Sequence, residues 1–360
     1  MLVLALDDRP QLLVESFRRY DLAINTCISH ETVPNAALLY LQFVLLLYDT
    51  SYASHRCTVG NAMCAQHIDQ LARLAYNGCA MDQTLAHVLW YTLQLDIQLC
   101  LAGNMECGSF VRAYQLHGSR LPPCYAHEGQ PARNDMGSNA YATMESYLEL
   151  DRFISNKLAD LSLMALEVRH STDSFPSNVP MNQLRIIEFR NTLLSTWHEK
   201  VQNVLALTPG NTGMSLRTRL KTRLDLSYFK YSTVMLYLNT SMYRGQLSYN
   251  SDTRKQEIVW HARQILSMVS ELIDLRVMEQ HQLILSIFLA GVASNDNQDK
   301  YRACALLQTL EGRDISSSVT KTRELLQEIF VEQGIRHREG GFAIDVDWIS
   351  FSEKKVFIGI

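Results

Sequence analysis

The sequence predicts an all-α fold, a large bundle of packed antiparallel helices. Apolar residues recur at spacings of three and four along most of the 360 residues, which is the period of an amphipathic helix. Neither an alternation of strand and helix patterns nor a fixed repeat period is visible. The stretch from Glu279 to Glu311 holds an almost unbroken apolar run, a polar turn and a second amphipathic segment. A helix that is apolar all round must be enclosed by other helices, so this pair predicts the core of a multi-helix domain.

Composition supports one large, well-packed domain. Hydrophobic residues make up 47% of the chain and charged residues 19%, which is ample for a sizeable core, and we expect a single domain over residues 1–360. The formal net charge is −4, whereas domains that bind nucleic acid tend to be basic. We therefore expect no direct DNA binding by this chain.

The cysteines and the apolar runs indicate an intracellular protein. The eight cysteines are scattered, with no C-x-x-C pair, and are expected to be reduced core residues rather than disulfides or metal ligands. The longest apolar run, residues 36–48, contains Gln42 and is well short of the roughly 20 residues that span a bilayer. The N-terminal segment lacks the basic flank and the length of a signal peptide. We expect a soluble protein of the nucleus or cytoplasm, with no membrane association.

The first third of the chain is predicted to form five helices, over residues 9–27, 35–48, 61–76, 82–102 and 106–116. Pro34 marks the start of the second helix, because proline is favoured in the first helical turn. Gly78 and Gly103 follow the third and fourth helices, where glycine commonly ends a helix. Residues 117–140 then carry several glycines and prolines, and they form either an internal boundary or a long loop.

The remainder is predicted to begin with four helices, over residues 140–168, 183–207, 220–240 and 256–277, separated by turns rich in Ser, Pro, Gly and Asn. The last is the clearest, because Ile258, Ala262, Ile265 and Val269 recur at helical spacing. In the 279–311 pair, Gly291 is predicted to close the first helix. A further helix is predicted over 317–332, and the alternating tail, 342–360, is predicted to dock as short extended pieces.

Four residues are candidates for a pocket or a buried polar site: Trp90, Asp96, Arg112 and His281. Asp96 lies inside an apolar run, where an unpaired buried carboxylate is costly, so it must be paired or face a cavity. Arg112 is its candidate partner, and a structural ion pair is favoured over a ligand contact. His281 lies on an apolar helix, where a lone histidine is more often a hydrogen-bonded core residue than a ligand or base.

No catalytic motif is visible in the sequence. The chain has no G-x-S-x-G elbow, no phosphate-binding glycine loop, no G-x-G-x-x-G and no H-E-x-x-H. Glu167 and His170 have the spacing of one half of a di-iron site, but no second copy exists and an ion pair or cap at a helix end is favoured. The basic run from Arg217 to Arg223 is short and is interpreted as a solvated helix face. The sequence leans against an enzyme and predicts no metal or cofactor.

Three stretches resemble the fungal-specific transcription factor domain, the regulatory region behind the binuclear zinc cluster of many fungal activators. They are the 279–311 pair with its ending FLAGVAS, the stretch from Leu89 to Pro123, and the close Asp345-Val346-Asp347-Trp348. The resemblance implies a helical regulatory domain that controls transcription through protein partners, such as the transcriptional machinery or a full-length activator, with a small-molecule effector as an option.

The family's DNA-binding region is not found in the printed chain. A binuclear zinc cluster needs six closely spaced cysteines, so this chain is either a fragment of a longer activator or a protein that cannot contact operator DNA by the usual means. Two alternatives to a transcriptional regulator stay open. In the first, the chain is a family member recruited as a biosynthetic enzyme or small-molecule-binding protein in a secondary-metabolite pathway. In the second, it is a pure interaction module. A polar-lined cavity would favour the former, and an exposed apolar patch the latter.

Overall fold

The structure is a computed structural model that describes residues 19, 22, 36–52, 59–76, 83–117, 138–207, 214–246, 252–275, 280–311, 318–338 and 346–349. Within these ranges the secondary structure is helical, with eleven α-helices, one 3₁₀ helix and no strand. The prediction of an all-α fold is therefore confirmed. Of the helix predicted over 9–27, only residues 19 and 22 are described, and both are helical.

The helices up to residue 117 form a compact N-terminal group, which we call the α2–α5 group. Its members are α2 (Ala36–Tyr52), α3 (Val59–Tyr76), α4 (Gln83–Ala102) and α5 (Ser109–His117). Helix α4 ends in a Schellman motif: the Gly103 N–H donates to the Cys100 carbonyl and the Asn104 N–H to the Leu99 carbonyl. Gly103 has φ 99°, a left-handed conformation that glycine adopts without strain. The predicted end of this helix is thus confirmed.

Three long helices follow, α6 (Ser138–Ser174), α7 (Val179–Ala206) and α8 (Met214–Thr240), and the 3₁₀ helix η3 (Pro176–Asn178) joins the first two. Four more helices complete the described fold: α9 (Asp252–Leu275), α10 (Gln280–Ala293), α11 (Asn297–Glu311) and α12 (Ser318–Arg338). Residues 118–137 lie outside the described residues, so neither interpretation of segment 117–140 is tested.

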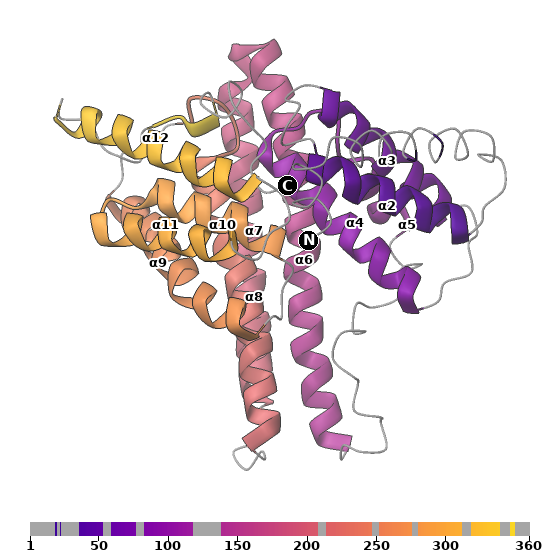
Figure 1. The fold of residues 1–360 in the computed structure, drawn as a ribbon. Helices are drawn as coiled ribbons and strands as arrows, with labels where there is room; N and C mark the ends of the chain where they lie inside the picture. The colour runs from indigo at the N-terminus through magenta and orange to yellow at the C-terminus, as the bar shows by residue number, and fades with distance from the viewer. Residues whose placement is uncertain are drawn as a thin grey trace.

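Figure 1 shows the three long helices running along the molecule, with the α2–α5 group on one side and α9–α12 on the other. Helix α6 packs against α4, α7 and α8, while α10 packs against α4, α8, α9, α11 and α12. The two sides therefore meet through α4, whose partners α6 and α10 come from different parts of the chain. A buried hydrophobic cluster runs through helices from α2 to α12.

Helix α10 is the enclosed helix that its apolar run predicts, since every residue from Leu283 to Ser294 is buried. The prediction that Gly291 closes it is wrong, because the helix continues to Ala293. A Cβ atom at Gly291 would meet Leu326 Cδ2 at 2.8 Å and Ala303 Cβ at 3.1 Å. This glycine therefore allows α11 and α12 to approach α10 closely rather than ending the helix.

The tail differs from its predicted extended form where it is described. Trp348 and Ile349 are helical, and with Val346 they are buried against the core. No helix among the described residues is long and apolar enough to cross a membrane.

Candidate functional sites

The Asp96 carboxylate of α4 caps the start of α5. Asp96 is fully buried, and its two oxygens accept bonds from backbone N–H groups: Oδ1 from Gly108 at 2.7 Å and Oδ2 from Val111 at 3.0 Å. The first N–H groups of a helix have no partner within the helix, and a negative charge is favoured there. Gly108 has φ 101°, so glycine suits the turn that brings its N–H to the carboxylate.

Burial dominates the ionisation of Asp96 and raises its pKa to about 6. Hydrogen bonds from the backbone of Gly108, Val111 and Phe110 act in the opposite direction, as does the positive charge of Arg112. A carboxyl group with this pKa changes its charge close to neutral pH, and its protonation alters the cap on α5.

The four residues singled out in the sequence do not form one cluster. Trp90 and Asp96 lie on α4, and Arg112 lies exposed on α5. The ring of Trp90 meets that of Tyr114 edge to face, with centroids 5.7 Å apart. His281 lies at the start of α10, and its side chain is outside the described part of the structure. Trp90 and Asp96 therefore belong to the α4–α5 contact, whereas Arg112 acts on Asp96 through its charge alone. The hydrogen-bond partners of Asp96 are backbone N–H groups and not the predicted Arg112 side chain.

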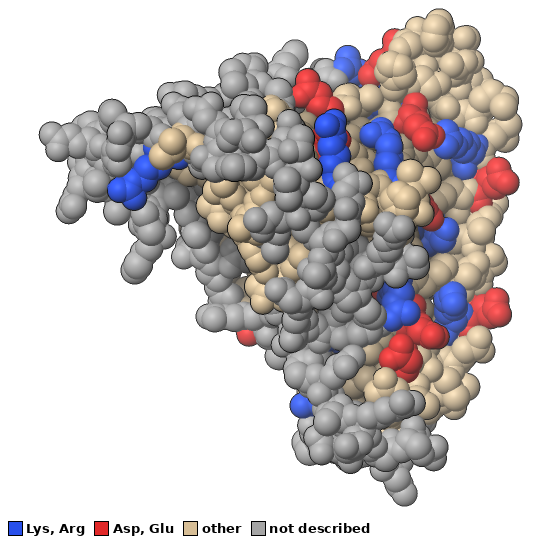
Figure 2. Space-filling model, turned by 90° about the vertical axis from the view of Figure 1, so that its right-hand side faces the viewer, with Lys and Arg blue, Asp and Glu red and all other residues tan. Residues whose placement is uncertain are grey.

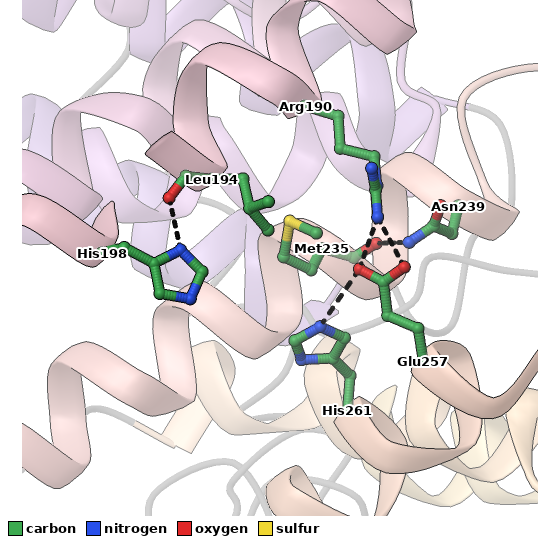
Figure 3. A network of polar contacts seen from close by, with 7 residues as sticks. All are labelled: Arg190, Leu194, His198, Met235, Asn239, Glu257 and His261. Atoms are coloured by element: carbon green, nitrogen blue, oxygen red, sulfur yellow. Dashed lines mark hydrogen bonds and ion pairs between the residues drawn. The ribbon is translucent and has the colours of Figure 1, made fainter. Parts of the chain in front are cut away.

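A polar network joins α7 to α9 (Figure 3). The Arg190 Nη2 group donates to both oxygens of Glu257, at 2.8 and 2.6 Å, and His261 Nε2 lies 3.8 Å from Glu257 Oε1. Figure 3 also shows Asn239 and His198, which bond to carbonyls of their own helices. Burial raises the pKa of Glu257, but the contacts with His261 and Arg190 outweigh it and the pKa is lowered. The network thus holds an ionised carboxylate between two helices.

Aromatic rings surround the same network. Trp197 stacks on Tyr231 with centroids 4.5 Å apart and planes 6° from parallel, and Tyr231 meets His261 edge on. Burial raises the pKa of Tyr231 to about 12, so its hydroxyl stays protonated. Trp260 packs against His261 and is 48% exposed. The rings and the charge pair together join α7, α8 and α9.

A second buried polar cluster is centred on Arg169 of α6, which is 4% exposed. Its guanidinium donates to the Cys100 and Leu101 carbonyls of α4, at 3.1 and 3.0 Å, and to the Ser241 carbonyl after α8, at 3.1 Å. It also contacts the Tyr237 hydroxyl. These partners are neutral and lie at the ends of two helices, where the helix dipole favours a positive charge.

Exposed apolar side chains gather near the turn between α6 and α7. Phe175 is 63% exposed, Met181 69% and Leu184 61%. Met181 and Leu184 are three residues apart on α7 and so share one face. Large exposed apolar side chains of this kind are typical of protein interaction sites when they cluster. We call these three residues the α6–α7 apolar surface.

The charged surface is mixed in sign. Blue and red side chains alternate over the described part of the face in Figure 2, with no large positive patch. In the basic run, Lys221 pairs with Asp225 and Glu271. Glu167 pairs with Arg185 of α7 rather than acting with His170. The described residues contain no group of three His, Cys, Asp or Glu side chains arranged to hold a metal ion.

Sequence reasoning missed both Arg169 and the Arg190 network. Glu257 and His261 are four residues apart on a helix, a spacing visible in the sequence, but Arg190 is 67 residues away from Glu257. Arg169 follows Val168 on the buried side of a helix, yet three of its bonds are to backbone carbonyl groups, which leave no signal in the sequence.

The comparisons with known proteins give one positive result. Residues 150–356, more than half of the chain, match the sequence model of one protein family. That family is described as the fungal specific transcription factor domain. No curated protein and no solved structure matches the chain significantly.

Proposed function

The chain belongs to the fungal specific transcription factor domain family, and from this premise we propose that it regulates transcription by binding other proteins. The observation that carries the proposal is the family match over residues 150–356, which includes α7 to α12 and most of α6. Transcription regulation is the role of the family. We further propose that the chain binds protein partners, acts in the nucleus and responds to a small-molecule effector.

The surface supports proteins rather than DNA as the partners. The formal net charge is −4, and the described charges in Figure 2 are mixed in sign, whereas DNA binding needs clustered positive charge. The α6–α7 apolar surface offers Phe175, Met181 and Leu184 to a partner. Burying three such side chains in an interface is favourable, at about 1.5–3 kcal/mol for each side chain fully removed from water. We propose that a protein of the transcriptional machinery docks there.

A reporter experiment tests the proposal. The full chain is fused to an unrelated DNA-binding domain, and transcription from a reporter with the matching operator is measured in fungal cells. We expect output to change relative to the DNA-binding domain alone, and we expect the triple substitution Phe175→Ser, Met181→Ser and Leu184→Ser to abolish the change. These side chains are exposed, so their replacement should leave folding intact.

The matched control places serine at exposed apolar positions elsewhere, at Tyr301 and Val331, which are 78% and 66% exposed. This control should keep the reporter output of the parent chain. If the parent fusion leaves the reporter unchanged and the protein stays outside the nucleus, the regulatory proposal is wrong. If the control loses output as fully as the triple variant, the docking site is wrongly placed.

A further inference from the structure

Arg169 links two parts of the molecule that are far apart in the chain. Its guanidinium bonds to the carbonyls of Cys100 and Leu101 and to the carbonyl of Ser241. The Tyr237 hydroxyl adds a bond to the Leu101 carbonyl at 2.6 Å. Helix α4 and the end of α8 are thus held to one buried side chain of α6. The α4 end of this link precedes residue 150, where the family match begins.

The chain after α8 also holds the C-terminal segment 346–349. Trp348 Nε1 donates to Ser241 Oγ at 2.9 Å, and the Gly245 N–H donates to Asp347 Oδ2 at 3.1 Å. The Trp348 ring meets Phe288 of α10 edge to face, with centroids 5.3 Å apart. Because Trp348 is 2% exposed, this segment is an integral part of the core.

Ser241 is shared by both sets of contacts. Its carbonyl accepts from Arg169 and its hydroxyl accepts from Trp348, while its own N–H donates to the Tyr237 carbonyl at 2.8 Å. A shift of this residue therefore changes both bonds together. The loss of one member of a buried polar network leaves its neighbours unsatisfied at low dielectric.

We propose that residues 346–349 form a strap that, through Ser241 and Arg169, holds the end of α4 in place. When the strap is docked, Arg169 is fixed and the last turn of α4 is tied to α6 and α8. Release of the strap loosens the α4 end and, with it, the turn whose Gly108 N–H bonds to Asp96.

Two substitutions in the full chain each remove the hydrogen bond between Trp348 and Ser241, one from the donor side and one from the acceptor side. Trp348→Phe keeps an aromatic ring beside Phe288 but removes the indole N–H, and Ser241→Ala removes its acceptor. Native-state hydrogen exchange is measured at the amides of Gly103 and Asn104, which bond into the end of α4. We expect exchange there to become about tenfold faster in each variant, since loss of one buried hydrogen bond is worth about 1–1.5 kcal/mol.

The effects of the two single variants should not add in the double variant, because both changes break the bond between Trp348 and Ser241. Ser241→Ala also removes the contact of Ser241 Oγ with Thr240 Oγ1 at 2.8 Å, so the double variant should match Ser241→Ala. The matched control is Leu310→Ala in α11, a fully buried residue outside the contacts of the strap. It destabilises the core without breaking the link. Exchange at Gly103 and Asn104 should therefore rise more in the strap variants than in a control of equal global stability. Unchanged exchange in both strap variants, or an equal rise in the control, would overturn the proposal.

Discussion

At the scale of single residues, Asp96 shows how one carboxylate is both buried and ionisable. It has no side-chain partner among its hydrogen bonds, and its oxygens accept from the backbone of Gly108 and Val111. Helix capping by a residue close in sequence is common, whereas this cap comes from another helix, twelve residues earlier. The apolar run around Asp96 predicts its burial, but the identity of its partners depends on the path of the chain after Gly103.

The stability of the protein should depend on pH through Asp96. The pKa of its carboxyl group is about 6 when folded, against an ordinary value of 3.8. Between these values the folded protein binds more protons than the unfolded chain, so the free energy of unfolding rises as the pH falls from about 7 to 4. The contribution is up to about 3 kcal/mol. Urea unfolding of the parent and of Asp96→Asn, measured across this range, checks it.

The comparison with Asp96→Asn isolates this residue, because asparagine does not titrate and keeps one oxygen for the cap. The difference in unfolding free energy between the parent and Asp96→Asn should increase steadily toward pH 4. Parallel curves for the two proteins would mean that the pKa of Asp96 is not raised in the folded state.

At the scale of helices, the sequence predicts where most elements lie and fails where tertiary contacts decide the outcome. The pattern places α4 and α9 within a few residues of their observed bounds, because apolar periodicity is clear in both helices. Helix α6 is predicted to stop at Val168 and continues to Ser174. Its last turns carry polar residues such as Thr172, whose hydroxyl accepts from Asn182 of α7, and a helical period cannot reveal that contact.

The prediction that Gly291 closes α10 fails for the same reason, because tertiary contacts decide the role of this glycine. Its surroundings lead to a prediction about helix packing. Alanine at Gly291 would meet Leu326 and Ala303, whereas alanine at Gly334 of α12 meets no atom within 4 Å. Replacing glycine by alanine within a helix gains up to about 1 kcal/mol when space is available. We expect Gly334→Ala to raise the melting temperature and Gly291→Ala to lower it, because overpacking costs about 1–3 kcal/mol.

The two glycine variants control for each other, since both change the same residue type within a helix. Thermal unfolding followed by circular dichroism at 222 nm would measure the two melting temperatures. If Gly291→Ala proves as stable as Gly334→Ala, the close approach of α11 and α12 to Gly291 is not required for packing.

At the scale of the whole molecule, α4 lies outside the family match but packs against helices that lie within it. Residues 150–356 match the family model, yet α4 packs against α6 and α10 and supplies the carbonyls that Arg169 binds. We therefore propose that the structural domain extends further toward the N-terminus than the matched region, as composition predicts for a single domain. No sequence pattern could locate the bonds from Arg169 to α4, because their acceptors are backbone carbonyls, which every residue carries.

Removal of the residues before α6 tests that dependence. A chain of residues 138–360 would expose the faces of α6 and α10 that α4 covers, and it would leave Arg169 with fewer partners. We expect this shorter chain to lose its cooperative thermal transition or to melt well below the full chain. Circular dichroism and size-exclusion chromatography would show the change. A cooperative melt at the temperature of the full chain would mean that the α2–α5 group is dispensable for folding.

The cap on α5 also constrains how this protein can vary. Asp96 and Gly108 are joined twice, once through the backbone and once through the hydrogen bond between the carboxylate and the N–H group, so the chain between them is a closed ring. Gly103 and Gly108 both have positive φ and fix the two bends of that ring. Adding or deleting one residue there would move the start of α5 away from its acceptor. The α4–α5 connection is therefore a poor place for an inserted tag or a change of length, even though it is a turn between two helices.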